Sequence, residues 1–233
     1  MMKFYRKIIK TSVDLKPYTS LVIHSLEGCN LNCYKCFNKE EILEKKHEVY
    51  LSEEEVLKRL ELNGFLADAV IFSGGEFLIS DIDEIINFLK KVRGIYPGYI
   101  IIYTNGTFPE KVKKLIELNL VDGFHVDMKL PFHSKVLKTE DFEKILGLRM
   151  AQEVNKKVLN TISIVIEQNS SMSQIRTVRY PNLPKEYFKE IETYICQLNE
   201  KYGSNVPYKL NDFIDNPFQG LFFLYSCRLF PRT

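Results

Sequence analysis

Short β-rich runs alternate with amphipathic helical runs along this chain of 233 residues, and that alternation constrains the fold more than any other feature. The pattern is typical of parallel β/α units, in which each helix returns the chain to the start of the next strand. The expected strands are 21–26, 68–72, 99–103, 121–128, 159–166 and 206–213, and the expected helices are 52–62, 81–92, 110–118, 141–155 and 184–201. The alternation therefore predicts an α/β fold built on a six-stranded parallel sheet.

The chain gives no sign of a linker or an internal repeat, so we expect a single domain over 1–233. Its core is expected at about 19–213, with a divergent C-terminal segment at 214–233. Lys and Arg number 32 against 30 Asp and Glu, a net charge of +2 that gives no electrostatic argument for nucleic acid or an anionic membrane. No apolar run is long enough to cross a bilayer. The expectation is a cytoplasmic protein without nucleic-acid or membrane partners.

Three of the five cysteines lie within eight residues, directly after the first expected strand. An odd number of cysteines does not suit a disulfide framework. The segment between Cys29, Cys33 and Cys36 is too polar for a buried core segment, which favours a metal site. No histidine stands at a zinc-finger distance from Cys36. Three thiolate ligands alone favour an iron–sulfur cubane with one open iron over zinc. Cys196 is expected to be buried on a helix.

Unusual residues also follow the next three expected strands. Functional loops of parallel sheets lie at the carboxyl ends of their strands. The residues at these positions are Ser73, Gly74, Gly75 and Glu76, then Thr104, Asn105 and Gly106, then Asp127, Met128 and Lys129. We therefore expect the four strand ends to form one site, whereas His125, inside a strand, is interpreted as a core or barrel histidine.

The cysteine spacing, followed by Gly-Gly-Glu after the second strand, resembles the radical S-adenosylmethionine (SAM) superfamily. The resemblance covers about 19–131. It implies a partial (β/α)6 barrel and a [4Fe-4S] cluster held by Cys29, Cys33 and Cys36. SAM would bind the open iron, and its reductive cleavage would yield a 5′-deoxyadenosyl radical.

The same resemblance implies roles for further residues. Gly74 to Glu76 would hold the amino group of SAM, and Ser73, Thr104, Asn105, Asp127 and Lys129 would lie at the SAM site. Many members carry an aromatic residue immediately before the third cysteine. Here that position is Lys35, so Tyr34 and Phe37 are the candidates for packing on adenine. Tyr103 stands where some activating enzymes have an Asp.

Local strings around these motifs resemble the activators of glycyl-radical enzymes, and above all the activating proteins of anaerobic ribonucleotide reductase. That resemblance implies a glycyl-radical enzyme as partner and an electron donor such as flavodoxin or ferredoxin. Two alternatives stay open. One is a small-molecule radical enzyme similar to 7-carboxy-7-deazaguanine synthase, and the other is a non-catalytic metal-binding module.

Overall fold

A computed structural model describes residues 1–215 of the chain. The strands are β1 (Lys3–Tyr5), β2 (Ile9–Leu15), β3 (Tyr18–Ser25), β4 (Tyr50–Ser52), β5 (Ala69–Gly74), β6 (Tyr99–Thr104), β7 (Gly123–Asp127), β8 (Gln174–Arg179) and β9 (Tyr208–Asp212). The α-helices are α1 (Glu53–Asn63), α2 (Ile82–Ile95), α3 (Pro109–Glu117), α4 (Thr139–Leu146), α5 (Gln152–Gln168) and α6 (Lys185–Tyr202), and short helical turns occupy Lys39–Glu44, Gly64–Leu66 and Phe77–Ile79.

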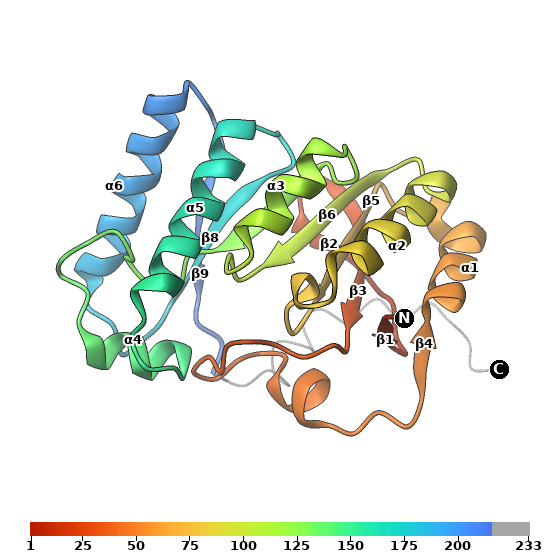
Figure 1. The fold of residues 1–233 in the computed structure, drawn as a ribbon, viewed down its shortest axis with the longest axis horizontal. Helices are drawn as coiled ribbons and strands as arrows, with labels where there is room; N and C mark the ends of the chain where they lie inside the picture. The colour runs from red at the N-terminus through yellow and green to blue at the C-terminus, as the bar shows by residue number, and fades with distance from the viewer. Residues whose placement is uncertain (216–233) are drawn as a thin grey trace.

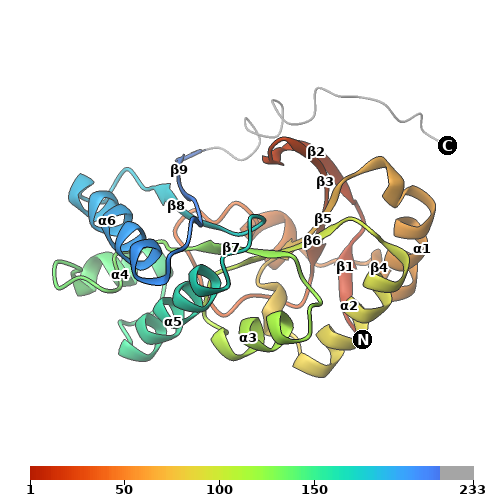
Figure 2. The same cartoon turned by 90° about the horizontal axis from the view of Figure 1, so that it is seen from above.

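One nine-stranded sheet organises the molecule. Its order is β4-β1-β3-β5-β6-β7-β8-β9, with β2 pairing β3 as an antiparallel hairpin. Six strands, β3 and β5 to β9, run parallel, while β1 and β4 add an antiparallel edge. The helices cover the outer face of the curved sheet, as the view from above shows (Figure 2). The predicted α/β fold is confirmed, and in the part of the chain described no strand pair joins β2 to β9 to close the barrel.

Apolar residues fill both faces of the central strands because parallel strands under a helix layer have no solvated face. Val70, Phe72 and Ile102 belong to the large core beneath the helices. Alternate residues, including Ile71 and Ile101, point to the opposite face and form a second, small apolar cluster on the concave side. The concave side therefore has an apolar base of its own.

The α1 helix begins where the sequence predicts. Ser52 accepts a hydrogen bond from the backbone N–H of Glu55, and the Glu55 carboxylate accepts one from the Ser52 backbone N–H. This reciprocal capping box satisfies two backbone donors at the start of the helix. It also places Val56 and Leu60 on the buried side.

The second half of the chain departs from the expected element order. The segment 159–166, expected as a strand, lies inside α5, and the expected helix 141–155 divides into α4 and the start of α5. Buried residues of α5 recur at Val158, Ile162 and Val165, which is helical spacing. The β-branched residues of this segment favour a strand locally, but packing of one helical face against the core decides the outcome.

The fifth parallel strand is β8, which falls in a part of the sequence without a clear pattern. The sequence did not predict the strands β1, β2 and β4. Cys196, expected to be buried, is exposed on α6 because Ile195 takes the inward position beside it. Cys227 and nearly all of the C-terminal segment lie outside the described residues.

Candidate active site

A cavity of about 1100 Å³ opens at the carboxyl ends of the parallel strands. The cysteine loop runs along the lower edge of the molecule in Figure 1, directly after β3. Of the residues predicted to form the site, those that line the cavity are Cys29, Cys33, Cys36, Phe37, Ser73, Gly74, Gly75, Glu76, Thr104, Asn105, Asp127 and Lys129. The structure thus brings together residues from four strand ends that are far apart in the sequence.

Tyr34 is the predicted site residue that does not line this cavity. Its ring stacks on Phe213, with 6.1 Å between the ring centroids, and lies 6.4 Å from the ring of Tyr180. Phe37 does line the cavity and remains 45% exposed. Of the two aromatic side chains beside Lys35, Phe37 is therefore the one with free surface toward a ligand.

Distant segments hold the cysteine loop in place. The backbone N–H groups of Asn32 and Tyr34 donate to the last carbonyl groups of α4, at Leu146 (3.0 Å) and Ile145 (2.9 Å). On the other side of the loop, the Glu76 N–H donates to the Gly28 carbonyl oxygen at 2.8 Å. The loop is therefore fixed by both the second strand end and the C-terminal end of α4.

Gly74 and Gly75 allow the loops after β3 and β5 to approach closely. Gly74 has a φ of +132°, and a Cβ on it would lie 2.3 Å from the backbone oxygen of Ser25. A Cβ on Gly75 would lie 2.1 Å from the oxygen of Gly28. Both distances are impossible for a real side chain, so contact between the two loops itself requires these glycines.

The carboxylate of Glu76 is buried beneath the site and is fully engaged by the protein. It accepts hydrogen bonds from the Asn105 N–H (2.6 Å), the Thr104 hydroxyl (2.9 Å) and the Leu78 N–H (3.1 Å). Burial raises the pKa of Glu76 to about 7, although the three donors oppose the shift. Glu76 thus fixes the turn that follows β6.

Asn105 connects that turn to the cysteine loop. Its side-chain amide donates to the Asn30 side-chain oxygen at 2.9 Å and contacts the Cys29 sulfur at 3.8 Å. The Asn105 side-chain oxygen accepts hydrogen bonds from both the backbone N–H and the hydroxyl of Thr107. The amide therefore has one orientation, with its NH₂ group toward the sulfur.

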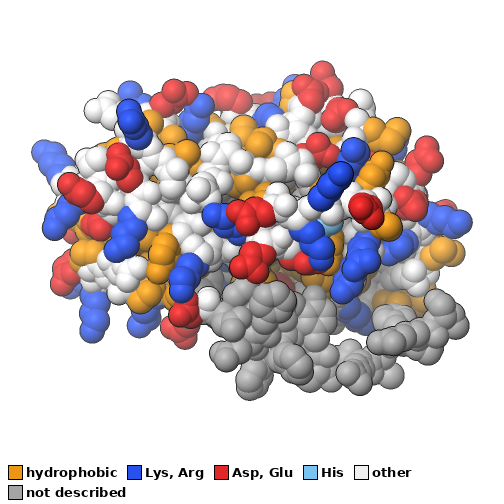
Figure 3. All heavy atoms as spheres, turned by 90° about the horizontal axis from the view of Figure 1, so that it is seen from below, with side chains coloured by type: hydrophobic (Ala, Val, Ile, Leu, Met, Phe, Trp, Pro, Cys, Tyr) orange, Lys and Arg blue, Asp and Glu red, His pale blue; other side chains and the backbone are white. Residues whose placement is uncertain are grey.

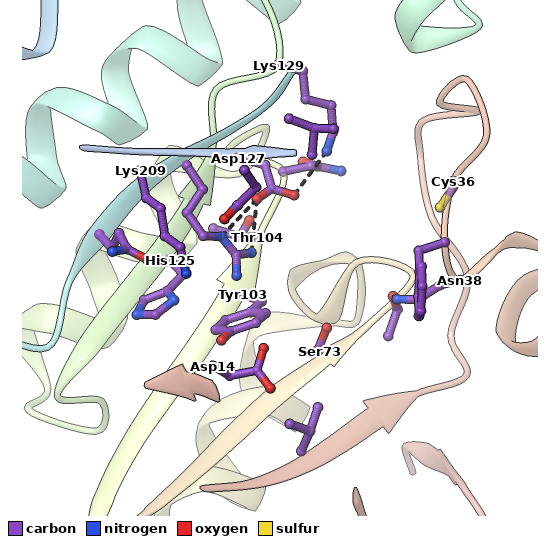
Figure 4. Close-up of a pocket in the computed structure, with 18 of the residues that line it drawn as sticks. Asp14, Cys36, Asn38, Ser73, Tyr103, Thr104, His125, Asp127, Lys129 and Lys209 are labelled. Atoms are coloured by element: carbon purple, nitrogen blue, oxygen red, sulfur yellow. Dashed lines mark hydrogen bonds and ion pairs between the residues drawn. The ribbon is translucent and has the colours of Figure 1, made fainter. Parts of the chain in front are cut away.

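Three charged side chains, Asp127, Lys129 and Arg176, form the opposite wall of the cavity. Figure 4 labels the first two of them. The Asp127 carboxylate lies 2.9 Å from the Lys129 ammonium and 2.9 Å from a guanidinium nitrogen of Arg176. Burial acts to raise the pKa of Asp127, but the two cations outweigh it and hold that pKa at about 2. Together these three side chains carry one net positive charge.

Arg176 was not predicted as a site residue. It lies on β8, paired in register with Asp127 of β7. Its guanidinium carbon lies 3.9 Å from the centroid of the Tyr103 ring. The signal that could have revealed it is the alternation in 174–179, where a charged residue occupies an inward position of a strand-like run.

The thiols suit an iron–sulfur cluster. Burial raises the pKa of Cys33 to about 11 and also raises that of Cys29, so these groups become thiolates only when a positive partner binds them. The Cys29 sulfur already accepts hydrogen bonds from the Leu31 N–H and the Asn105 amide, which favour the thiolate. No three His, Cys, Asp or Glu side chains within 1–215 are close enough to share one metal ion. A cubane instead spreads its thiolates over separate irons.

A family model described as "Radical SAM superfamily" matches residues 23–194, nearly three-quarters of the chain. The chain belongs to the radical SAM superfamily. Enzymes of this superfamily use a [4Fe-4S] cluster and SAM, and the cysteines of this radical SAM protein provide donors of the right kind for that cluster.

Two relatives come from Methanocaldococcus jannaschii. The protein named "Putative glycyl-radical enzyme activating enzyme" is 30% identical over 178 residues, which are 76% of this chain and 68% of that protein. The second relative, 7-carboxy-7-deazaguanine synthase, is 27% identical over 176 residues, and the match covers 65% of each chain. This radical SAM protein is thus similar to members with different named activities.

Among solved structures, anSMEcpe with bound AdoMet matches with a TM-score of 0.55 and 16% identity. That match covers 81% of this chain and 49% of the other. Escherichia coli coproporphyrinogen III oxidase, a radical SAM enzyme, matches with a TM-score of 0.53 and 13% identity over 82% of this chain and 43% of its own. The radical SAM protein described here therefore shares their fold and spans about half of their length. Within 1–215, none of its helices combines the length and apolar character needed to cross a membrane.

Proposed function

We propose that this radical SAM enzyme activates a glycyl-radical enzyme. The observation that carries the proposal is the match to an activating enzyme over 76% of the chain, combined with a cavity that reaches from the cysteine loop to Arg176. The proposed partner is an anaerobic ribonucleoside-triphosphate reductase, and the proposed electron donor is a flavodoxin or a ferredoxin.

Each part of the site has a separate task in this proposal. Cys29, Cys33 and Cys36 would hold the cluster, which together with SAM supplies the 5′-deoxyadenosyl radical when both are bound. The segment 73–76, which Gly74 and Gly75 allow to lie against the cysteine loop, would hold the ammonium group of SAM. The Asp127, Lys129 and Arg176 side chains offer fixed charges of both signs to the remaining polar groups of SAM. The hydrogen atom would pass from a glycine Cα of the partner to the 5′-deoxyadenosyl radical, which leaves 5′-deoxyadenosine and a glycyl radical.

The direct test is an anaerobic EPR experiment. The reconstituted protein is reduced with dithionite and mixed with SAM and the anaerobic ribonucleotide reductase from the same genome. The expected result is a glycyl-radical doublet together with stoichiometric 5′-deoxyadenosine. Formation of 5′-deoxyadenosine without the doublet would contradict the activase role and favour the second candidate, a small-molecule radical enzyme, which the similarity to 7-carboxy-7-deazaguanine synthase supports.

The cluster assignment has its own test in the pair Cys36→Ala and Cys196→Ala. Cys36 lines the cavity, whereas Cys196 is an exposed thiol on α6. We expect Cys36→Ala to abolish 5′-deoxyadenosine formation and the reduced-cluster EPR signal, and Cys196→Ala to retain both. An unchanged yield from Cys36→Ala would remove Cys36 from the cluster ligands.

A further inference from the structure

A row of polar side chains crosses the concave face of the sheet below the cavity. The parallel register pairs His24 of β3 with Ser73 of β5, and Tyr103 of β6 with His125 of β7. Phe72 of β5 pairs with Ile102 of β6 in parallel, so the residues that follow them, Ser73 and Tyr103, also lie side by side. All four polar residues line the cavity, and we call them the polar row. Figure 4 labels three of them, Ser73, Tyr103 and His125.

The polar row forms the floor of the cavity. Two residues earlier on the same strands, Val22, Ile71 and Ile101 form an apolar cluster that Met172 completes. Two residues later on β7 lies Asp127 with its cationic partners. The polar row thus lies between this apolar cluster and the charged wall. Apolar side chains could have filled the same interior layer of the sheet.

Three atoms of the polar row have no hydrogen-bond partner among the described residues. They are the Nδ1 atoms of His24 and His125 and the hydroxyl oxygen of Tyr103, each of which is itself buried. The whole His125 residue is only 2% exposed. Leaving such an atom unsatisfied costs about 1–3 kcal/mol, so buried polar groups normally have partners. The three atoms belong to residues that line one cavity, and a ligand bound there would supply the missing partners.

The polar row is uncharged at neutral pH. Burial lowers the pKa of His24 to about 4 and that of His125 to about 3, and it raises the pKa of Tyr103. Tyr103 lies between two planar groups, the His125 ring, with centroids 4.8 Å apart, and the guanidinium of Arg176. The charge of Arg176 is already paired with Asp127. The four side chains of the polar row therefore offer neutral donors and acceptors.

We propose that the polar row binds an uncharged stretch of peptide backbone, namely the glycine-bearing loop of the partner enzyme. This inference rests on the activase function proposed above. Neighbouring strands lie about 4.8 Å apart, so the four residues of the row extend over roughly 14 Å, the length of about four residues of extended chain. Peptide N–H and C=O groups along such a segment can satisfy the neutral atoms of His24, Tyr103 and His125.

The test compares Tyr103→Phe with Ser20→Ala. Tyr103→Phe removes the unpartnered hydroxyl and keeps the ring that packs against His125 and Arg176. Ser20→Ala removes another buried hydroxyl that has no partner within 1–215, but Ser20 does not line the cavity. Loss of one neutral hydrogen bond should raise the apparent KM for the reductase roughly three- to tenfold in Tyr103→Phe. The Kd for SAM and the EPR spectrum of the reduced cluster should not change, and Ser20→Ala should match the wild type throughout.

A second variant, His125→Phe, keeps the test valid if Tyr103→Phe does not fold. His125→Phe keeps a ring against Tyr103 and deletes the unpartnered nitrogen, and the same rise in KM is expected. A KM for the reductase that stays at the wild-type value in both variants, while the wild type forms the glycyl radical, would overturn the inference alone. An equal loss of SAM binding would also overturn it, because that result indicates a structural role. No glycyl radical in the wild type would overturn the activase proposal, and this inference with it.

Discussion

Asn105 is the residue through which the turn after β6 reaches the cysteine loop, and its contact with sulfur has a measurable consequence. An N–H group directed at a cysteine sulfur stabilises the more negative, reduced form of a cluster. Asn105→Ala should therefore lower the midpoint potential of the cluster, measured without SAM, by roughly 20–60 mV, the equivalent of one weak hydrogen bond.

Asn211→Ala is the matched control for Asn105→Ala. Asn211 also lines the cavity, but no hydrogen bond joins it to a cysteine among the described residues. Its midpoint potential should equal that of the wild type. Equal potentials in Asn105→Ala and Asn211→Ala would show that the 3.8 Å contact with Cys29 does not influence the cluster.

At the level of secondary-structure elements, the Asp127 carboxylate ties β7 to β8 through Arg176. Asp127→Asn leaves two largely buried cations without their anion. We expect it to lower the free energy of unfolding by about 2–3 kcal/mol. This value is smaller than for a fully buried ion pair because Asp127 is partly exposed. Urea unfolding of the cluster-free protein measures this loss.

The pH dependence of the Asp127 effect has a definite sign. The pKa of Asp127 is about 2 in the folded protein against an ordinary value of 3.8. The stability it contributes is therefore fully present above about pH 4 and is lost as the pH falls toward 2. The difference between wild type and Asp127→Asn should shrink over that window. Asp212→Asn, which changes an exposed carboxylate of β9, is the matched control for the loss of a surface charge.

The elements themselves could be predicted where the local pattern and the packing agree. The strands around 68–72 and 99–103 and the helix capped by Ser52 were expected close to their observed positions. The region 159–166 could not be assigned correctly, because its β-branched residues favour a strand while its helical spacing of apolar residues favours α5. Only contacts with the rest of the core decide between the two.

At the scale of the whole molecule, the cysteine loop depends on close contact with the loop after β5. Gly75→Ala would place a Cβ only 2.1 Å from the Gly28 oxygen, so one of the two loops must move. We expect the reconstituted variant to hold less iron than the wild type, while its far-UV circular dichroism stays the same because the sheet lies outside the contact.

Gly94→Ala provides the control for Gly75→Ala. Gly94 lies in α2, and a Cβ there would meet no atom within 4 Å. This variant should keep full iron content and gain about 0.5–1 kcal/mol in stability from the better helix former. Full iron content in Gly75→Ala would show that the loop contact is not needed for the cluster.

The sequence also revealed most of the candidate site, because the strand ends of a parallel sheet converge whatever the details of the fold. It gave only a weak signal for Arg176, the alternation in 174–179, and none for the polar row. His24, Tyr103 and His125 lie inside strands, where a polar residue has no local signature of function. Their common property is a shared register across β3, β6 and β7, which exists only after the chain has folded.

The hydrogen bonds from Asn32 and Tyr34 to the end of α4 also bear on how the protein is made. The cysteine loop leaves the ribosome early, yet the carbonyl groups that hold it, at Ile145 and Leu146, are synthesised more than a hundred residues later. The nascent chain therefore has no ordered cluster site until α4 has been translated. We therefore expect iron and sulfide to be delivered after α4 has been synthesised. Until then the three thiols have to be kept reduced.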